Sequence, residues 1–274
     1  MKFSKWQGCG NDFVYIDGRN AKVDYGEFAK KYCDRHFGIG ADGILALEDS
    51  DKADVRMRII NPDGSEPEMC GNGIRCFARA LYDNGIVNKK EFTVETGAGV
   101  LVPKIVMKDG KVDGVTVDMG KPRLNAEEIP VKGFGDGRVI SKPIEVAGKD
   151  YNITCVSMGN PHAVVFVEDA ENCGIEKLGK LFESHSVFPN KTNTEFVQVL
   201  DREHIRMRVW ERGAAITLAC GTGACASLVA SVLNGKTERR AKVILDGGTL
   251  DIEWANDDRI YMTGPAELVF EGEI

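Results

Sequence analysis

The chain has 274 residues, of which 43% are hydrophobic and 28% are charged, and its formal net charge is −7. This length and composition allow a sizeable core, as one large domain or two of moderate size. The negative charge argues against a general nucleic-acid or membrane-surface binder. No secretory signal is visible and the longest apolar run, at 224–233, is too short to span a bilayer, so we expect a cytoplasmic protein.

The first half of the chain predicts a strand, a helix and a second strand in that order. Residues 55–60 (VRMRII) alternate apolar and basic side chains, as in a strand with one buried face. After the motif Cys-Gly-Asn-Gly at 70–73, apolar residues recur at helical spacing: Ile74, Phe77, Ala78, Leu81 and Tyr82. Asn84-Gly85 is a typical end for that helix, and 92–96 (FTVET) predicts the next strand.

The second half repeats this order after a stretch, 121–150, whose three prolines and four glycines suggest a connection. Residues 205–210 (IRMRVW) again alternate, and a second Cys-Gly-X-Gly follows at 220–223. The segment 224–233 is apolar on nearly every side, which predicts a helix buried within its domain. A further strand is expected at 242–246 (KVILD).

Landmarks about 150 residues apart indicate an internal duplication. They are RMRIIN (56–61) with RMRVWE (206–211), Cys70 with Cys220, Asn84-Gly85 with Asn234-Gly235, Gly97 with Gly247, and GNDFVYID (10–17) with GNPHAVVFV (159–167). We therefore expect two copies of one α/β module, each with strands wrapped on a central helix. The same comparison pairs His162 with Asp12, and Asn61 with Glu211.

The duplicated Cys-Gly-X-Gly suggests a specific chemistry. A helix N-terminus offers unpaired N–H groups and partial positive charge, and flanking glycines let an anion approach them. The same dipole should lower the pKa of a cysteine there towards neutrality. Two facing copies could hold a carboxylate while one thiolate removes an α-proton and the opposite thiol returns one. This inversion needs no metal and no cofactor, and we see no motif for either.

The segment NPDGSEPEMCGNGIR (61–75) resembles the signature of the diaminopimelate epimerase family. Further stretches match that family in order: GNDF (10–13), DRHFGIGADG (34–43), GNPH (159–162), NTEF (193–196) and ERG to LACGTGACA (211–226). The resemblance implies a cofactor-independent isomerase that interconverts L,L- and meso-diaminopimelate in lysine and peptidoglycan-precursor synthesis. It implies two pseudo-symmetric domains, 1–120 and 121–263, with 264–274 as a candidate strand for the first. Each would be a mostly antiparallel barrel around a helix, with the active site in the interdomain cleft, and the protein would be a homodimer.

The resemblance also implies roles by matched position. Cys70 and Cys220 would be the two acid/bases, and His162 and Glu211 would orient or polarise groups at the reacting centre. Backbone N–H groups at Gly71, Asn72, Gly221 and Thr222 would bind the reacting carboxylate. The remaining substrate contacts would come from Asn11, Asn61, Asn160, Asn193, Glu211 and Arg212, of which the last two would read the distal amino and carboxylate groups.

The chain departs from the family pattern at three places, and two alternative functions remain open. Cys9 stands where many relatives have leucine, Gly43 where some have a substrate-contacting glutamine, and Ala215-Ile216 where others have Gly-Glu. One alternative is a racemase of another amino acid such as histidine, which would share both thiols and differ at the distal end. The other is a non-catalytic protein that uses its eight cysteines to bind zinc or sense redox state, which the lack of C-x2-C pairs disfavours.

Overall fold

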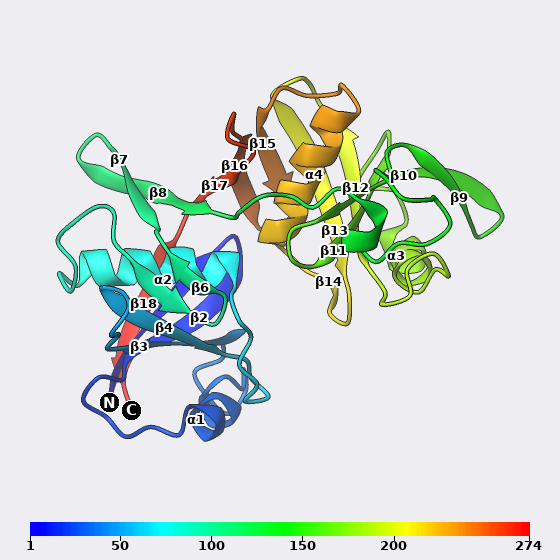
Figure 1. Cartoon of the computed structure of the whole chain (residues 1–274). Helices are drawn as coiled ribbons and strands as arrows, with labels where there is room; N and C mark the ends of the chain where they lie inside the picture. Colours follow the sequence, from blue (N-terminus) through cyan, green and yellow to red (C-terminus); the bar gives the residue numbers. More distant parts are fainter. The chain divides into compact units, whose positions relative to one another are not determined.

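The structure is a computed structural model that describes residues 1–274, and it divides into two compact units (Figure 1). Unit 1 comprises Met1–Asp118 together with Thr263–Ile274, and unit 2 comprises Met119–Met262. The chain therefore leaves unit 1 once and returns to it for its last strand. The stretch 121–150, interpreted above as a connection, belongs to unit 2.

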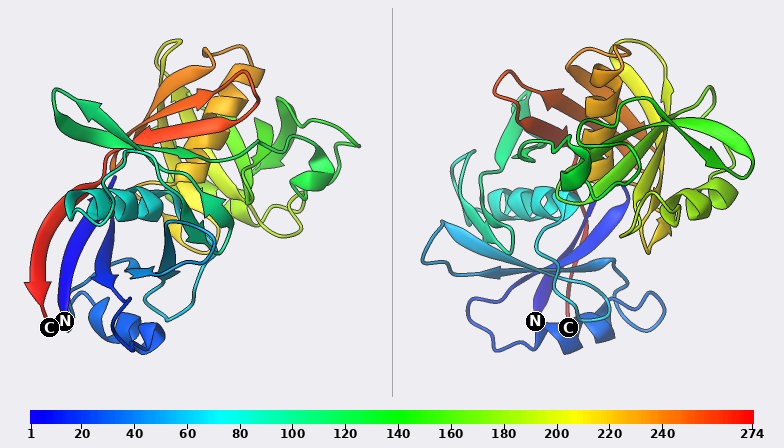
Figure 2. Two further views of the ribbon diagram at one scale, coloured as in Figure 1. Left: turned by 60° about the vertical axis from the view of Figure 1, so that its left-hand side comes forward. Right: turned by 45° about the vertical axis from the view of Figure 1, so that its right-hand side comes forward.

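Unit 1 is built on a seven-stranded sheet. Its strands, in order across the sheet, are β18 (Glu267–Glu273), β1 (Lys2–Gly8), β2 (Asn11–Asp17), β3 (Gly43–Glu48), β4 (Val55–Ile60), β5 (Val94–Thr96) and β6 (Gly99–Leu101). The hairpin β7 (Lys104–Lys108) and β8 (Lys111–Asp118) and the helices α1 (Tyr25–Tyr32) and α2 (Gly71–Asp83) complete the unit. The two chain ends lie side by side because β1 and β18 pair antiparallel (Figure 2).

Unit 2 repeats this plan. Its sheet runs β17 (Ile260–Gly264, entering unit 1 at its end), β16 (Gly248–Trp254), β15 (Arg240–Leu245), β13 (His204–Glu211), β12 (Asn193–Val199), β11 (Pro161–Phe166), β10 (Lys149–Ser157) and β9 (Lys142–Val146), and β14 (Ala215–Ile216) pairs with β13. The helices are α3 (Ile175–Glu183), α4 (Gly221–Leu233) and a short 3-10 helix, Ala126–Glu128. No helix of the chain is long and apolar enough to cross a membrane.

The two central helices bury the faces that their sequences predict. In α2 the residues Ile74, Phe77, Ala78 and Leu81 are fully buried, and the helix contacts β1, β2, β4 and β8. The helix α4 is buried on nearly all sides and contacts β10, β11, β12, β13, β15 and β16. Both helices end where expected, at Asn84 and Asn234, whose backbone N–H groups close the last turns.

The duplication is confirmed at the level of strand register. The parallel pair β2–β3 aligns Phe13 with Gly43, and the parallel pair β11–β12 aligns His162 with Asn193. Because Gly43 and Asn193 are 150 residues apart, the counterpart of His162 is Phe13. The pairing of His162 with Asp12 was therefore wrong by one residue, since the offset in this strand is 149.

The expected barrels are open sheets. Each unit is mixed and mostly antiparallel, with parallel pairs only at β2–β3 and β4–β5 in unit 1 and β11–β12 and β13–β15 in unit 2. The sheet of unit 1 ends at β18 and β6, and that of unit 2 ends at β9, with no pairing that closes either path. Each unit is therefore a curved, open sheet packed on a central helix.

Candidate active site

Cys70 is the N-cap residue of α2. Its backbone is extended (φ −139°, ψ 123°) immediately before the helical Gly71, so its side chain lies at the helix N-terminus. The Cys70 thiol donates to Asn11 Oδ1, with Sγ and Oδ1 3.6 Å apart, and Asn72 Nδ2 donates to the same oxygen at 3.2 Å. Unit 1 thus brings Asn11, Cys70 and Asn72 together, with an acceptor facing the thiol.

A partly buried network of hydrogen bonds fixes this acceptor. The Asn11 amide nitrogen donates to Asp42 Oδ2 at 2.8 Å, which turns the Asn11 oxygen towards Cys70. Arg75 is fully buried and donates to Asn72 Oδ1 at 2.9 Å and to the Gly71 carbonyl at 3.1 Å. Charge-assisted hydrogen bonds of this kind hold side chains in one geometry, so the start of α2 is pre-organised.

Cys220 starts α4 in the same way. Its backbone is extended (φ −122°, ψ 108°), and its Sγ accepts a hydrogen bond from the Gly223 N–H at 3.3 Å. The Thr222 hydroxyl lies 3.4 Å from the same sulfur. A side chain at position 223 would bring its Cβ within 2.7 Å of Glu195 Oε1 and 3.2 Å of Cys220 Sγ, so the motif requires glycine there.

The pKa of Cys220 differs from the prediction. Burial raises this pKa well above its ordinary value, and the negative charges of Glu211 and Glu195 raise it further. The hydrogen bonds from Thr222 and Gly223 act in the opposite direction but are outweighed. The prediction that the helix N-terminus lowers the pKa towards neutrality is therefore wrong for Cys220, which is a thiol at neutral pH in this conformation.

Behind Cys220 a chain of hydrogen bonds leads into the core of unit 2. Asn160 Nδ2 donates to Thr222 Oγ1 at 3.3 Å, and Asn160 Oδ1 lies 3.0 Å from His162 Nε2. His162 Nδ1 lies 2.6 Å from Oε1 of Glu195, and both side chains are fully buried. Glu195 was missed at the sequence level, although it lies in the quoted motif NTEF and stands where the first copy has Leu45.

The residues expected to read the distal end of a substrate gather at the end of β13. Glu211 accepts a hydrogen bond from the Thr217 hydroxyl. The backbone N–H of Arg212 donates to Oδ1 of the buried Asn193 at 2.7 Å, and its guanidinium donates to the Asn190 carbonyl at 3.0 Å. Asn61 occupies the equivalent place in unit 1, after β4, where its amide donates to Ser65 Oγ at 2.9 Å.

Two of the departures have structural consequences. Cys9 is buried beside Arg75, which donates towards its sulfur at 3.9 Å, and burial raises the pKa of this third thiol. At Gly43 an added Cβ would lie 2.7 Å from the Ile60 carbonyl oxygen. A larger side chain at position 43 would therefore require the backbone of β3 or β4 to shift.

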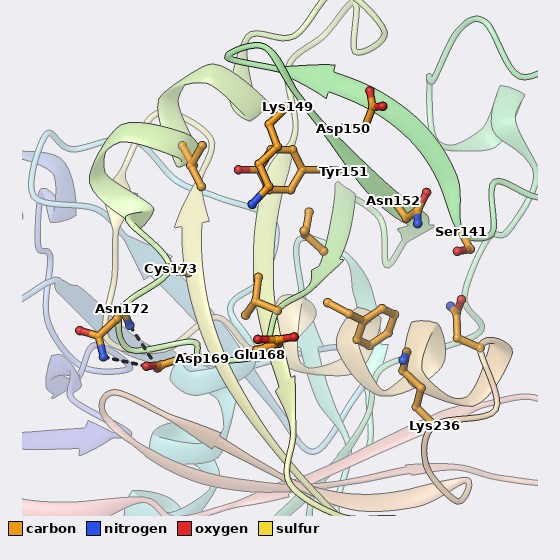
Figure 3. Close-up of a pocket in the computed structure, with 15 residues that line it drawn as sticks. Ser141, Lys149, Asp150, Tyr151, Asn152, Glu168, Asp169, Asn172, Cys173 and Lys236 are labelled. Atoms are coloured by element: carbon orange, nitrogen blue, oxygen red, sulfur yellow. Dashed lines mark hydrogen bonds between the residues drawn. The ribbon is translucent and has the colours of Figure 1, made fainter.

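A groove of about 680 Å³ on unit 2 is lined by other residues (Figure 3). Its charged lining is mixed and includes Lys149, Lys236, Glu168 and Asp169. The Lys236 ammonium packs over the Phe166 ring at 4.8 Å. None of the site residues predicted from the sequence lines it. No group of three or more His, Cys, Asp or Glu side chains is placed to hold a metal ion.

Comparison with known proteins gives matches over nearly the whole chain. A family model described as diaminopimelate epimerase matches residues 3–125 and 154–269. The diaminopimelate epimerase of Pelotomaculum thermopropionicum is 54% identical over 276 residues, covering 100% of this chain and 98% of the relative. Diaminopimelate epimerase 1 of Nostoc sp. is 55% identical over 281 residues, covering 100% and 99%.

Solved structures that share the fold are more distant in sequence. A phenazine biosynthesis protein of the PhzF family from Bacillus anthracis aligns with a TM-score of 0.73 at 19% identity, covering 100% of this chain and 98% of that one. A probable proline racemase from Agrobacterium radiobacter aligns with a TM-score of 0.68 at 16% identity, covering 100% and 92%. At these identities the likeness shows the fold alone.

Proposed function

The chain belongs to the diaminopimelate epimerase family, and we propose that it interconverts L,L- and meso-2,6-diaminopimelate by moving protons at two thiols. The family resemblance seen in the sequence is confirmed, and the chain is an isomerase. The observation that supports the mechanism best is the repeated helix start, with Cys70 and Cys220 as the equivalent N-cap residues of α2 and α4.

In the proposed mechanism the reacting carboxylate binds the backbone N–H groups at two helix N-termini. These groups belong to Gly71, Asn72, Gly221 and Thr222, and their partial positive charge stabilises the carbanion-like transition state. One thiolate removes the α-proton from one face of the carbon, and the other thiol gives its proton to the opposite face. The product is inverted at that carbon, and the protonation states of Cys70 and Cys220 are exchanged.

The distal end of the substrate would be read by Glu211 and Arg212. Diaminopimelate has a second ammonium and a second carboxylate, which suit a glutamate and a guanidinium fork. The four asparagines expected at the site are further donors and acceptors for such a substrate: Asn11, Asn61, Asn160 and Asn193. A histidine racemase would have no distal carboxylate to bind, so this set favours diaminopimelate over that alternative. His162 would act on the reacting centre by holding Asn160, to which it is hydrogen-bonded.

Several broader properties belong to the same proposal. We propose a cytoplasmic enzyme of lysine and peptidoglycan-precursor synthesis that uses no metal and no pyridoxal phosphate, and that has a small-molecule substrate and no nucleic-acid or membrane partner. We also propose a homodimer. Its support is the edge strand β18, where Leu268, Val269 and Phe270 are consecutive and 44–54% exposed, an arrangement suited to pairing with a second copy.

The test is proton NMR of L,L-diaminopimelate with the reduced protein in D₂O, without pyridoxal phosphate. We expect the α-proton signal to disappear while the meso isomer accumulates, because the thiol protons exchange with solvent. A panel of other L-amino acids, histidine first, is run in parallel. Exchange with histidine and none with diaminopimelate would overturn the substrate assignment, and exchange with neither would overturn the racemase chemistry.

A further inference from the structure

Glu195 occupies a position that packing alone does not explain. Its side chain is fully buried, Oε1 lies 2.6 Å from His162 Nδ1, and Oε2 has no hydrogen-bond partner. A buried carboxylate with an unpartnered oxygen is costly. The equivalent residue of unit 1, Leu45, is also fully buried, so the module folds with an apolar side chain at this place.

The directions of the hydrogen bonds that lead from Glu195 to Cys220 can be assigned one by one. Asn160 Oδ1 can only accept, so His162 Nε2 carries a hydrogen and donates it. Asn160 Nδ2 can only donate, so Thr222 Oγ1 accepts from it. The hydroxyl hydrogen of Thr222 is then available to Cys220 Sγ, 3.4 Å away.

This order requires one proton between His162 and Glu195. Because Nε2 is protonated, Nδ1 and Oε1 can lie 2.6 Å apart only if they share a hydrogen. The pair is either imidazolium with carboxylate or imidazole with carboxylic acid, and its net charge is zero in both cases. The shared proton therefore offsets the charge of Glu195, which by itself raises the pKa of Cys220. Without this proton, Nδ1 and Oε1 would both be acceptors, and their lone pairs would face each other.

The surroundings of the pair agree with a retained proton. Burial raises the pKa of Glu195 and outweighs the charge and hydrogen bond of His162, which lower it, and the charge of Glu211 on β13 raises it further. The other titratable groups that interact with Glu195 are Cys155 on β10 and Cys220 at the start of α4, and burial raises the pKa of both thiols. No positive group other than His162 is among these neighbours.

We propose that Glu195 is a positioning residue for the Cys220 acid/base. The proton that Glu195 shares with His162 fixes the direction of each hydrogen bond in the chain, and at its end the Thr222 hydroxyl donates to Cys220 Sγ. That hydroxyl, together with the Gly223 N–H, stabilises the Cys220 thiolate when it forms. This inference rests on the proposed role of Cys220. It adds a residue that contacts neither the substrate nor the sulfur.

The experiment measures how fast iodoacetamide alkylates Cys220 and Cys70 in the same substrate-free sample, by peptide mass spectrometry across a pH series. Only the thiolate reacts, so the rate below the pKa reports how well the protein stabilises it. Cys70 lies in the other unit and is the internal control. Five proteins are compared: wild type, Glu195→Leu, Glu195→Gln, Thr222→Val and the double variant of Glu195→Leu with Thr222→Val. Far-UV and near-UV circular dichroism verifies that each is folded.

We expect Glu195→Leu to slow alkylation of Cys220 about tenfold, the effect of weakening one hydrogen bond to a charged group, and to leave Cys70 unchanged. The double variant should react no more slowly than Thr222→Val, because both changes interrupt one chain. Glu195→Gln should restore most of the rate, since its amide can donate to Nδ1. The proposal would be overturned if Cys220 of Glu195→Leu were alkylated at the wild-type rate. It would also be overturned if the two effects added in the double variant, or if the rate at Cys70 changed as much as the rate at Cys220. Alkylation needs no substrate, so failure of the diaminopimelate NMR test would leave this experiment valid.

Discussion

Leu45 and Glu195 occupy the same place in the two copies of the module, as the third residue of β3 and of β12, and both are fully buried. Each faces the second glycine of its Cys-Gly-X-Gly, since an added Cβ at Gly73 would lie 3.2 Å from Leu45 Cδ2 and one at Gly223 would lie 2.7 Å from Glu195 Oε1. The two helix starts are therefore alike in backbone and different in what lies behind them. A symmetric scaffold thus gives its two helix-start thiols different surroundings, an apolar side chain behind Cys70 and a carboxyl group behind Cys220.

The two-thiol mechanism predicts that Cys70→Ala and Cys220→Ala each abolish epimerisation, by at least about a hundredfold, because each thiol serves one face of the carbon. The α-proton NMR assay measures this, and circular dichroism verifies that each variant is folded. Cys173→Ala is the matched control, since Cys173 is half-buried in the groove of unit 2 and should leave the rate unchanged. Wild-type activity in either single catalytic variant would falsify the two-base account.

Arg212→Ala should discriminate between substrates. Losing a guanidinium that binds a distal carboxylate costs about 1.5–3 kcal/mol, so kcat/KM for diaminopimelate should fall roughly ten- to hundredfold. A truncated analogue without the distal carboxylate should be affected far less. Arg202→Ala, which removes an exposed arginine paired with Glu238, is the control and should change neither substrate. Equal losses with both substrates would contradict distal recognition.

The glycines of the two motifs give a matched pair of variants. At Gly223 an added methyl would meet Glu195 Oε1, which cannot withdraw because His162 holds it, so Gly223→Ala should lose activity and destabilise the protein by about 1–3 kcal/mol. At Gly73 the neighbours are the flexible ends of Leu45 and Ile59 at 3.2 Å, which can move. Gly73→Ala should therefore be milder in urea unfolding, and an equal or larger loss there would contradict this difference.

The two helix starts could be predicted from the sequence, but the side chains packed behind them could not. Cys70 and Cys220 could be placed because a glycine-flanked cysteine precedes a helical apolar pattern in both copies. Glu195 could not, because Thr194, Glu195 and Phe196 are all buried in β12, and a strand covered on both faces has no alternating pattern to read. The pKa of Cys220 depends on how deeply the packed unit buries it, which no local motif encodes. His162 was mispaired because GNDF (10–13) and GNPH (159–162) are offset by 149 residues, one fewer than the other landmarks.

Asp12 gives a prediction about stability and pH. Burial opposes its ionisation, but hydrogen bonds and charges from Arg35 and Lys5 outweigh burial and lower the pKa of Asp12 to about 2, from 3.8. A carboxyl whose pKa is lower in the folded state binds protons more weakly there. Its contribution to the free energy of unfolding is therefore complete above pH 3.8 and is lost as pH falls towards 2.

Urea unfolding at a series of pH values measures the loss. Asp12→Asn should unfold more easily than wild type at pH 7 and should show a shallower loss of unfolding free energy between pH 4 and pH 2. Asp51→Asn is the control, because Asp51 is exposed on unit 1 and, unlike Asp12, takes part in no ion pair. If Asp12→Asn and wild type lose stability in parallel over this range, the ion pairs of Asp12 do not stabilise unit 1.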